Sequence, residues 1–183
     1  QLIIKEEGVL AGVDVARKVF LHLDKDFKFE QILKDGDRVK PGDIAFRVEG
    51  RTRTLLMAER LVLNIMQHMS GIATMTARYV DRLRGLHTQV IDTRKTTPGM
   101  RLLDKMAVKI GGGGNHRIGL FDMILLKDNH IDFAGGIDKA IVRAHEYLKA
   151  KGKDLRIEIE VRNFDELDQV LRIGGVDRIM LDN

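Results

Sequence analysis

The feature that most constrains the fold is a series of short apolar or glycine-rich runs, each of which stops at a cluster of polar residues. Three such places follow one another along the chain: 90–91 before 92–99, 111–114 before 115–117, and 123–126 before 127–130. Short apolar runs of this kind are typical of strands buried in a parallel sheet. Ligands of α/β folds bind at the carboxyl ends of such strands, so the series predicts a binding site built from strand ends and a glycine loop.

The order of predicted elements supports a parallel α/β arrangement. Strands are predicted at residues 89–92, 121–126, 155–161 and 177–182, and helices at 137–148 and 164–171, with one or two helical turns at 102–110. This alternation predicts a parallel α/β barrel or an open sheet, with its site at the carboxyl face. In the third strand Glu158 and Glu160 recur with period two, so both share one face. In a barrel that face would point into the lumen.

The N-terminal part has a different character. Residues 9–12, 27–29 and 44–48 are strand-like runs separated by Asp-Gly and Pro-Gly turns, which indicates a small β-rich module. Residues 19–20 are open to two interpretations, a further strand or part of a short helix over 14–20. The pattern alone places this module at residues 1 to about 50.

A long helix is predicted between the two parts. Apolar residues recur at steps of three and four over 55–84, with an interruption at Ser70 and Gly71. Between Leu55 and Met66 apolar residues also occupy most other positions, which predicts a helix buried nearly all round. Arg60 lies within it, so we expect Arg60 to reach a partner chain or a site rather than solvent.

The polar clusters themselves indicate an anionic ligand, although each has an alternative. Arg94 and Lys95 lie in a turn rich in hydroxyl groups, which suits a multiply charged oxyanion or is simply a polar turn. The four glycines are either a flexible linker or a backbone that approaches a ligand closely. His116 and Arg117 follow them, and His116 is equally open to a structural and a catalytic role.

Composition narrows the class of ligand and the compartment. The 183 residues include no cysteine, which excludes disulfides and thiolate metal sites, and the chain begins with neither a basic segment nor a long apolar run. A reducing cytoplasmic setting without membrane insertion is the expectation. The net charge is +4, but charges of both signs are interleaved and aromatic residues make up 5%, which favours a small anion over a nucleic acid.

Several motifs in fixed order closely resemble the quinolinate phosphoribosyltransferase family, and the resemblance covers essentially the whole chain. They are Glu59-Arg60-x-x-Leu63-Asn64, residues 70–74, the segment Asp92-Thr93-Arg94-Lys95-Thr96-Thr97-Pro98-Gly99, the glycines before Asn115-His116-Arg117, and Lys127-Asp128-Asn129-His130. The resemblance implies part of an open-faced α/β sandwich domain at 1–54 and an incomplete parallel α/β barrel at 55–183. It also implies a chain truncated at both ends.

The reaction implied by the resemblance belongs to NAD biosynthesis. Phosphoribosyl pyrophosphate and quinolinate would react with Mg²⁺ to give nicotinate mononucleotide, pyrophosphate and CO₂. The family pattern implies a homodimer in which Arg60 enters the neighbouring subunit's site. The residues implied to bind substrates are Arg60, Arg94, Lys95, His116, Arg117 and Lys127.

The implied catalytic group consists of Glu160, Asp182, Lys95 and Lys127, with Asp128, Glu160 and Asp182 as candidate magnesium ligands. The guanidinium groups and His116 suit two carboxylates, and the lysines suit phosphates. The carboxylates suit a developing positive charge on the ribose, or the metal. Two other functions compete: a related superfamily member, either the homologue associated with molybdenum transport or a nicotinate phosphoribosyltransferase, and a non-enzymatic binding module. A monocarboxylate requires fewer cations, and a binding module fewer of these residues altogether.

Overall fold

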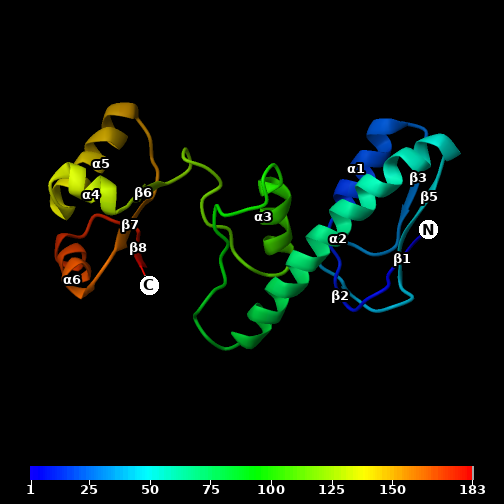
Figure 1. Cartoon of the computed structure of the whole chain (residues 1–183), viewed down its shortest axis with the longest axis horizontal. Coiled ribbons are helices and arrows are strands. Elements are labelled where there is room, and N and C mark those ends of the chain that lie inside the picture. Colours follow the sequence, from blue (N-terminus) through cyan, green and yellow to red (C-terminus); the bar gives the residue numbers. More distant parts are fainter. Residues whose placement is uncertain (183) are drawn as a thin grey trace. The chain divides into compact units, whose positions relative to one another are not determined.

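The computed structural model describes residues 1–182, which divide into two compact units. Unit 1 is Gln1–His116, and unit 2 begins at Arg117 (Figure 1). The chain is a mixed α/β protein, as predicted. The units do not coincide with the predicted division at residue 54, because the long helix after residue 54 packs into the same core as the N-terminal strands. That earlier boundary stays a prediction.

Unit 1 contains two small antiparallel sheets. One has the order β1-β5-β3 and the other pairs β2 with β4. The strands are β1 (Leu2–Ile3), β2 (Gly8–Val9), β3 (Lys28–Gln31), β4 (Arg38–Val39) and β5 (Ile44–Glu49). Phe46 of β5 is buried beside the rings of Phe20 and Phe29, with centroid distances of 6.3 and 4.6 Å. The predicted β-rich module is therefore present, and aromatic residues fill its core.

Two helices complete this core, α1 (Val13–Leu23) and α2 (Thr52–Arg82). Figure 1 shows α1 alongside the N-terminal half of α2, and both contribute buried side chains to the cluster that contains Phe46. Residues 19–20 lie within α1, so the helical interpretation of that segment is the correct one. Asp35 from the loop after β3 accepts the N–H of Val13 at 2.8 Å and so caps the first turn.

The predicted interruption of α2 at Ser70 and Gly71 is wrong, because the helix is continuous over 31 residues. Met69 and Ala73, on either side of the pair, are fully buried and hold the backbone in register. The Ser70 hydroxyl bonds to Ala11 N and O at 3.0 and 3.1 Å, so this polar side chain is satisfied by tertiary contacts. Tertiary packing here overrides the local breaking tendency of Ser-Gly.

The expectation that α2 is buried nearly all round is also wrong within this chain. Its buried stripe repeats at steps of three and four along one face: Ala58, Val62, Met66, Met69, Ala73 and Ala77. On another face Leu56 and Met57 are 64% and 61% exposed, and Arg60 and Leu61 beside them are exposed as well. The apolar residues around Arg60 therefore form a surface patch rather than a core.

The C-terminal half of α2 packs against α3 (Arg101–Ile110), which confirms the helical turns predicted at 102–110. The strand predicted at 89–92 is wrong as a buried strand. Only a single parallel bridge joins Ile91 to Gly114, and Ile91 is 42% exposed. Among the described residues, the glycine run is the one segment whose backbone pairs with residues 89–92, so a regular ladder of strand hydrogen bonds does not form.

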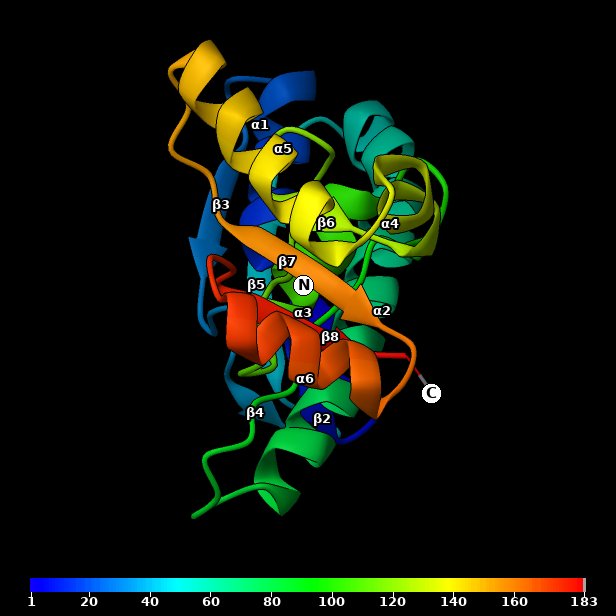
Figure 2. The same cartoon turned by 90° about the vertical axis from the view of Figure 1, so that its left-hand side faces the viewer.

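Unit 2 is a parallel sheet of order β6-β7-β8 with three helices (Figure 2). Its elements are β6 (Ile124–Leu126), α4 (Asp128–Ala134), α5 (Ile137–Lys151), β7 (Ile157–Val161), α6 (Phe164–Ile173) and β8 (Arg178–Leu181). The predicted strands and helices are confirmed with somewhat different bounds, and β6 begins only at Ile124. The short helix α4 was not predicted. Asn163 caps α6 by accepting the N–H of Glu166 at 2.9 Å, as its sequence position indicated.

The two faces of this sheet differ in the way that the strand period predicts. Ile157, Ile159 and Val161 of β7 are buried in one cluster with residues from α4, α5 and α6. Glu158 and Glu160 alternate with them and therefore lie on the opposite face. The helices cover one face, and the glutamates lie on the other, where Glu158 is fully buried beside Arg178 and Glu160 is partly exposed.

Candidate functional site

The carboxyl edge of the parallel sheet brings together two predicted site residues, Lys127 and Glu160. Leu126, the last residue of β6, pairs with Ile159 of β7. Lys127 follows Leu126 and Glu160 follows Ile159, so these two residues are neighbours across the two strands. The Lys127 Nζ donates to Glu160 Oε2 at 2.8 Å. The Glu160 side chain is 16% exposed and that of Lys127 45%, so the pair is accessible from one side.

Asp182 and Asp128 lie at the same edge of unit 2. The Asp182 N–H donates to Val161 O at 3.0 Å, which fixes its backbone one residue beyond β8. Asp128 is exposed and begins α4 directly after Lys127, whose N–H is accepted by His130 Nδ1 at 3.0 Å. Over residues 1–182 no group of three or more histidine or carboxylate side chains is arranged to hold a metal ion. A magnesium ion held by one or two carboxylates together with phosphate oxygens is compatible with this edge.

In unit 1 the loop that carries Arg94 and Lys95 is fixed by α3. The buried Asp104 carboxylate accepts the N–H of Thr97 at 2.9 Å and lies 2.6 Å from His68 Nε2 of α2. Burial raises the pKa of Asp104, but the hydrogen bonds from His68 and Thr97 outweigh it and lower the pKa overall. The Asp104 carboxylate therefore ties the loop to helices α2 and α3.

Arg94 and Lys95 differ in their surroundings. The Arg94 Nε is buried, and no hydrogen-bond partner reaches it among the described residues. Leaving such a donor unpaired is unfavourable by roughly 1–3 kcal/mol, which an incoming carboxylate would relieve. Lys95 is exposed, and its backbone N–H donates to the Thr93 hydroxyl at 3.0 Å. Both cations are therefore available to an anion.

His116 lies at the end of unit 1, where its backbone is bound by two buried charged residues. Asp92 Oδ1 accepts the His116 N–H at 2.8 Å, and Lys105 Nζ donates to His116 O at 3.3 Å. Neither Asp92 nor Lys105 was assigned a role from the sequence. Adjacent charges such as Asp104 and Lys105 on a short helix are ordinarily exposed, so no local signal marks them as interior.

The glycine run has a structural reason that the sequence interpretation did not include. A Cβ on Gly111 would lie 2.4 Å from the carbonyl oxygen of Ala73 and 2.8 Å from the Cβ of Thr76, both on α2. A Cβ on Gly113 would lie 2.9 Å from Thr76 Cγ2. Glycine is required at these places because the loop backbone approaches helix α2 closely. Neither a flexible linker nor ligand contact is needed to account for Gly111 and Gly113.

This packing makes a stability prediction with an internal control. Gly111→Ala is expected to lower the free energy of unfolding by about 1–3 kcal/mol, because the new methyl group overlaps backbone atoms of α2. Gly71→Ala, on the exposed face of α2 with open space around it, is expected to raise it by about 0.5–1 kcal/mol. Urea unfolding of both variants measures this. An unchanged Gly111→Ala midpoint would contradict the close approach.

Arg60 and Arg117 complete the predicted set. Arg60 is exposed on α2, away from the buried stripe, and Arg117 is partly buried at the start of unit 2. Within unit 1 the structure fixes the segments of Arg94, Lys95 and His116 around α3. Within unit 2 it joins Lys127 directly to Glu160 and places Asp128 and Asp182 at the same sheet edge.

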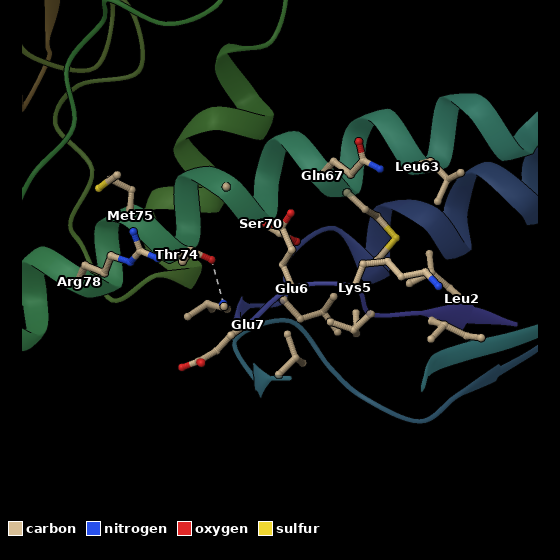
Figure 3. Close-up of a pocket in the computed structure, with 18 residues that line it drawn as sticks. Leu2, Lys5, Glu6, Glu7, Leu63, Gln67, Ser70, Thr74, Met75 and Arg78 are labelled. Carbon is tan, nitrogen blue, oxygen red and sulfur yellow. Dashed lines mark hydrogen bonds between the residues drawn. The ribbon is translucent and has the colours of Figure 1, made fainter. Parts of the chain in front are cut away.

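Unit 1 also contains a hollow of about 610 Å³ between β1, the following loop and α2 (Figure 3). Leu63, Gln67, Ser70, Thr74 and Arg78 of α2 line one side of it. The Thr74 hydroxyl accepts the N–H of Val9 at 2.9 Å, drawn dashed in Figure 3. None of the predicted site residues lines this hollow. The candidate chemistry therefore belongs to the strand ends and loops.

The chain is thus a mixed α/β protein, with cationic loops in unit 1 and a lysine–glutamate ion pair at the edge of the parallel sheet in unit 2. Residues 1–70 match the family model for the N-terminal domain of quinolinate phosphoribosyl transferase, and residues 72–183 match the model for its C-terminal domain. The chain belongs to the quinolinate phosphoribosyltransferase family, as the sequence motifs indicated.

Curated relatives and solved structures that resemble this chain carry names of the same family. A protein of Arabidopsis thaliana named nicotinate-nucleotide pyrophosphorylase (carboxylating), chloroplastic, is 47% identical over 98% of this chain and 52% of its own length. A probable nicotinate-nucleotide pyrophosphorylase (carboxylating) of Synechocystis is 40% identical, with 99% and 60% covered. The structure of NadC from Streptococcus pyogenes superposes with a TM-score of 0.88 at 45% identity, covering 99% of this chain and 63% of that one. The nicotinate-nucleotide pyrophosphorylase of Francisella tularensis gives 0.91 at 43% identity, with 99% and 63% covered.

The chain spans about half to two thirds of the length of these relatives. In the part of the chain that the structure describes, no helix has both the length and the apolar character needed to cross a bilayer.

Proposed function

We propose that the protein transfers the phosphoribosyl group of phosphoribosyl pyrophosphate to quinolinate, with loss of CO₂, to give nicotinate mononucleotide. The observation that carries this proposal is the guanidinium group of Arg94, whose Nε is buried without a partner among the described residues. A guanidinium group with an unpaired Nε–H suits a carboxylate, because its fork of donors can bind both carboxylate oxygens. Family membership supports the choice of a pyridine dicarboxylate.

The cationic residues have separate proposed roles. Arg94, His116 and Arg117 bind the two carboxylates of quinolinate, and Arg60 contributes from a neighbouring subunit. Lys95 and Lys127 contact phosphate groups as point charges. The exposure of Lys95 and the partial exposure of Lys127 support this, since each ammonium group can be reached from solvent.

Glu160 and Asp182 are proposed to stabilise positive charge on the ribose. The bond between the ribose anomeric carbon and the pyrophosphate oxygen breaks, pyrophosphate leaves with the electron pair, and the pyridine nitrogen bonds to that carbon. The carboxylate next to the nitrogen then leaves as CO₂, and the electron pair on the ring carbon takes a proton. Glu160 lies partly exposed on the sheet face opposite the helices, where a negative charge fixed before the reaction stabilises a developing cation.

Magnesium is proposed as the cofactor, and Asp128, Glu160 and Asp182 remain its candidate ligands. When bound, the ion would neutralise charge on the pyrophosphate oxygens, while one or two of these carboxylates hold it at the sheet edge. The three parallel strands of unit 2 are proposed to belong to an α/β barrel, whose lumen would contain Glu158 and Glu160. The compartment stays a prediction, since one relative is named chloroplastic.

A homodimer is proposed from the surface of α2. Leu56, Met57 and Leu61 are each more than half exposed around Arg60. Apolar residues with an arginine among them are enriched in protein interfaces, whereas scattered single residues are ordinary surface. A second copy of the chain would cover this patch and bring Arg60 to the site of its neighbour.

The direct test of substrate class compares quinolinate with nicotinate in the protein as its gene encodes it. Formation of nicotinate mononucleotide is followed with phosphoribosyl pyrophosphate and magnesium present. Quinolinate is expected to react, and nicotinate to react at least 100-fold more slowly, because nicotinate lacks one carboxylate and each of two charge-assisted hydrogen bonds to that group is worth roughly 1.5–3 kcal/mol. Preference for nicotinate would instead favour a nicotinate phosphoribosyltransferase.

Binding of the dicarboxylate depends on Arg94 in this account. Arg94→Ala is expected to weaken quinolinate binding by about 10-fold or more while leaving phosphoribosyl pyrophosphate binding nearly unchanged. Titration calorimetry measures both affinities. Arg84→Ala is the matched control, since Arg84 is exposed at the end of α2 and pairs with Asp81 at 2.8 Å. Equal loss of both ligands in Arg94→Ala would show that the assignment is wrong.

A further inference from the structure

A buried lysine of helix α3 in unit 1 makes a set of contacts that the proposed function does not use. Lys105 of α3 is only 2% exposed, although lysine is rarely fully buried unless it is paired. Its Nζ lies 2.5 Å from Asp92 Oδ1, whose side chain is also buried. The ammonium group is thus enclosed by protein, whereas Lys95 is exposed and Lys127 partly exposed, so it is not a contact for a substrate anion.

The pair binds both backbone groups of one residue, His116. Asp92 Oδ1 accepts the His116 N–H at 2.8 Å, and Lys105 Nζ donates to the His116 carbonyl oxygen at 3.3 Å. With its amide nitrogen turned toward acceptors, Asn115 donates to Asp92 Oδ2 and to Lys105 O, each at 2.9 Å. Two charges of opposite sign therefore fix the position of one peptide segment directly after the glycine run.

A buried ion pair contributes little net stability to a fold. Taking two charges out of water costs several kcal/mol per ion, and apolar replacements of buried pairs are often neutral or stabilising. The same pair can hold a bound backbone segment in one position, because charge-assisted hydrogen bonds are short and directional. A displacement of about 1 Å at a binding side chain can lower a reaction rate by roughly 100-fold.

We propose that Asp92 and Lys105 are positioning residues that set the backbone of His116 for binding of the pyridine dicarboxylate. This rests on the proposed function and adds residues to it. The two residues act through His116 and do not touch the substrate. They are expected to affect quinolinate binding selectively, since phosphate contacts are assigned to Lys95 and Lys127.

The main variant is the double substitution Asp92→Asn with Lys105→Met. It removes both buried charges at once, so no uncompensated charge remains to unfold the chain, and Asn can still accept the His116 N–H. Two contacts are lost, the one from Lys105 to the carbonyl oxygen and the one that Asn115 donates to Asp92 Oδ2, because the amide nitrogen of Asn cannot accept it. We expect quinolinate affinity by calorimetry to fall about 10-fold, with phosphoribosyl pyrophosphate affinity within about twofold of the parent.

Two further variants complete the experiment. Asn115→Ala changes an exposed residue, so the fold should persist, and quinolinate affinity should fall about threefold as Asp92 loses one contact. Lys109→Met, an exposed lysine on the same helix, is the control and should bind both ligands like the parent. Heat unfolding checks that each protein is folded.

The outcomes separate this inference from the proposed function. Parental quinolinate affinity in a folded double variant would overturn the positioning role, as would parental affinity in Asn115→Ala if the double variant does not fold. Loss of both ligands in equal measure in the folded variants would overturn it as well. Failure of the parent protein itself to bind quinolinate would instead contradict the proposed function.

Discussion

Glu160→Gln is expected to slow turnover by about 100-fold or more, with a smaller change in the Michaelis constant for either substrate. The substitution keeps the shape of the side chain and removes its negative charge on the sheet face opposite the helices. A charge that acts on the developing ribose cation matters more in the transition state than in the ground state. One preorganised electrostatic contact is worth roughly 2.7–4 kcal/mol, which corresponds to that loss of rate.

The ion pair with Lys127 provides a check on this interpretation. Because the Lys127 side chain is 45% exposed, loss of the pair should change the free energy of unfolding by only about 0–1 kcal/mol. Glu49→Gln is the matched control, since Glu49 forms an exposed pair with Lys28 at 3.4 Å. Asp182→Asn should act in the same direction as Glu160→Gln. Turnover of both variants is measured by steady-state kinetics at saturating magnesium. Near-parental turnover in both would show that neither carboxylate stabilises the transition state.

Mixing two inactive variants, Arg60→Ala and Lys127→Ala, is expected to restore activity. If Arg60 enters the site of the neighbouring subunit, a mixed dimer has one site that carries neither substitution. With complete exchange of subunits in a twofold dimer, half of the dimers are mixed, and activity should reach roughly one quarter of the parental value. The measurement is turnover of the mixture after exchange.

Each variant incubated alone under the same conditions is the control for this experiment. Exchange is verified separately by mixing tagged and untagged protein and isolating mixed dimers. If mixed dimers form and the mixture stays inactive, Arg60 acts within its own chain. A monomeric parent protein would contradict the dimer itself, and the apolar patch of Leu56, Met57 and Leu61 would then require another partner.

Local patterns predicted unit 2 well because its signals are local. The alternation in β7 identified the strand and placed Glu158 and Glu160 on one face, and the helical period together with Gly152 gave α5 and its end. These features depend on nearest neighbours in the sequence. The motif that contains Lys127 likewise sits at the strand end where the apolar run predicted it.

Features that depend on contacts between residues far apart in the chain could not be predicted from local sequence patterns. Apolar residues around Arg60 indicated burial, but the structure places them on the surface of unit 1. Lys105 resembles any surface lysine in sequence, and only the approach of Asp92 and His116 explains why it is interior. The glycines at 111 and 113 are explained by contacts with Ala73 and Thr76 of helix α2, which lie more than 30 residues earlier in the chain.

Coupling of phosphoribosyl transfer to decarboxylation can be measured with quinolinate carrying a labelled carbon in the carboxyl group next to the ring nitrogen. One CO₂ is expected for each nicotinate mononucleotide and each pyrophosphate formed, with no release without phosphoribosyl pyrophosphate. Arg94→Ala should depress this release at low quinolinate concentration, and Arg84→Ala should not. Retention of the label in the product, or release that does not require phosphoribosyl pyrophosphate, would contradict the account.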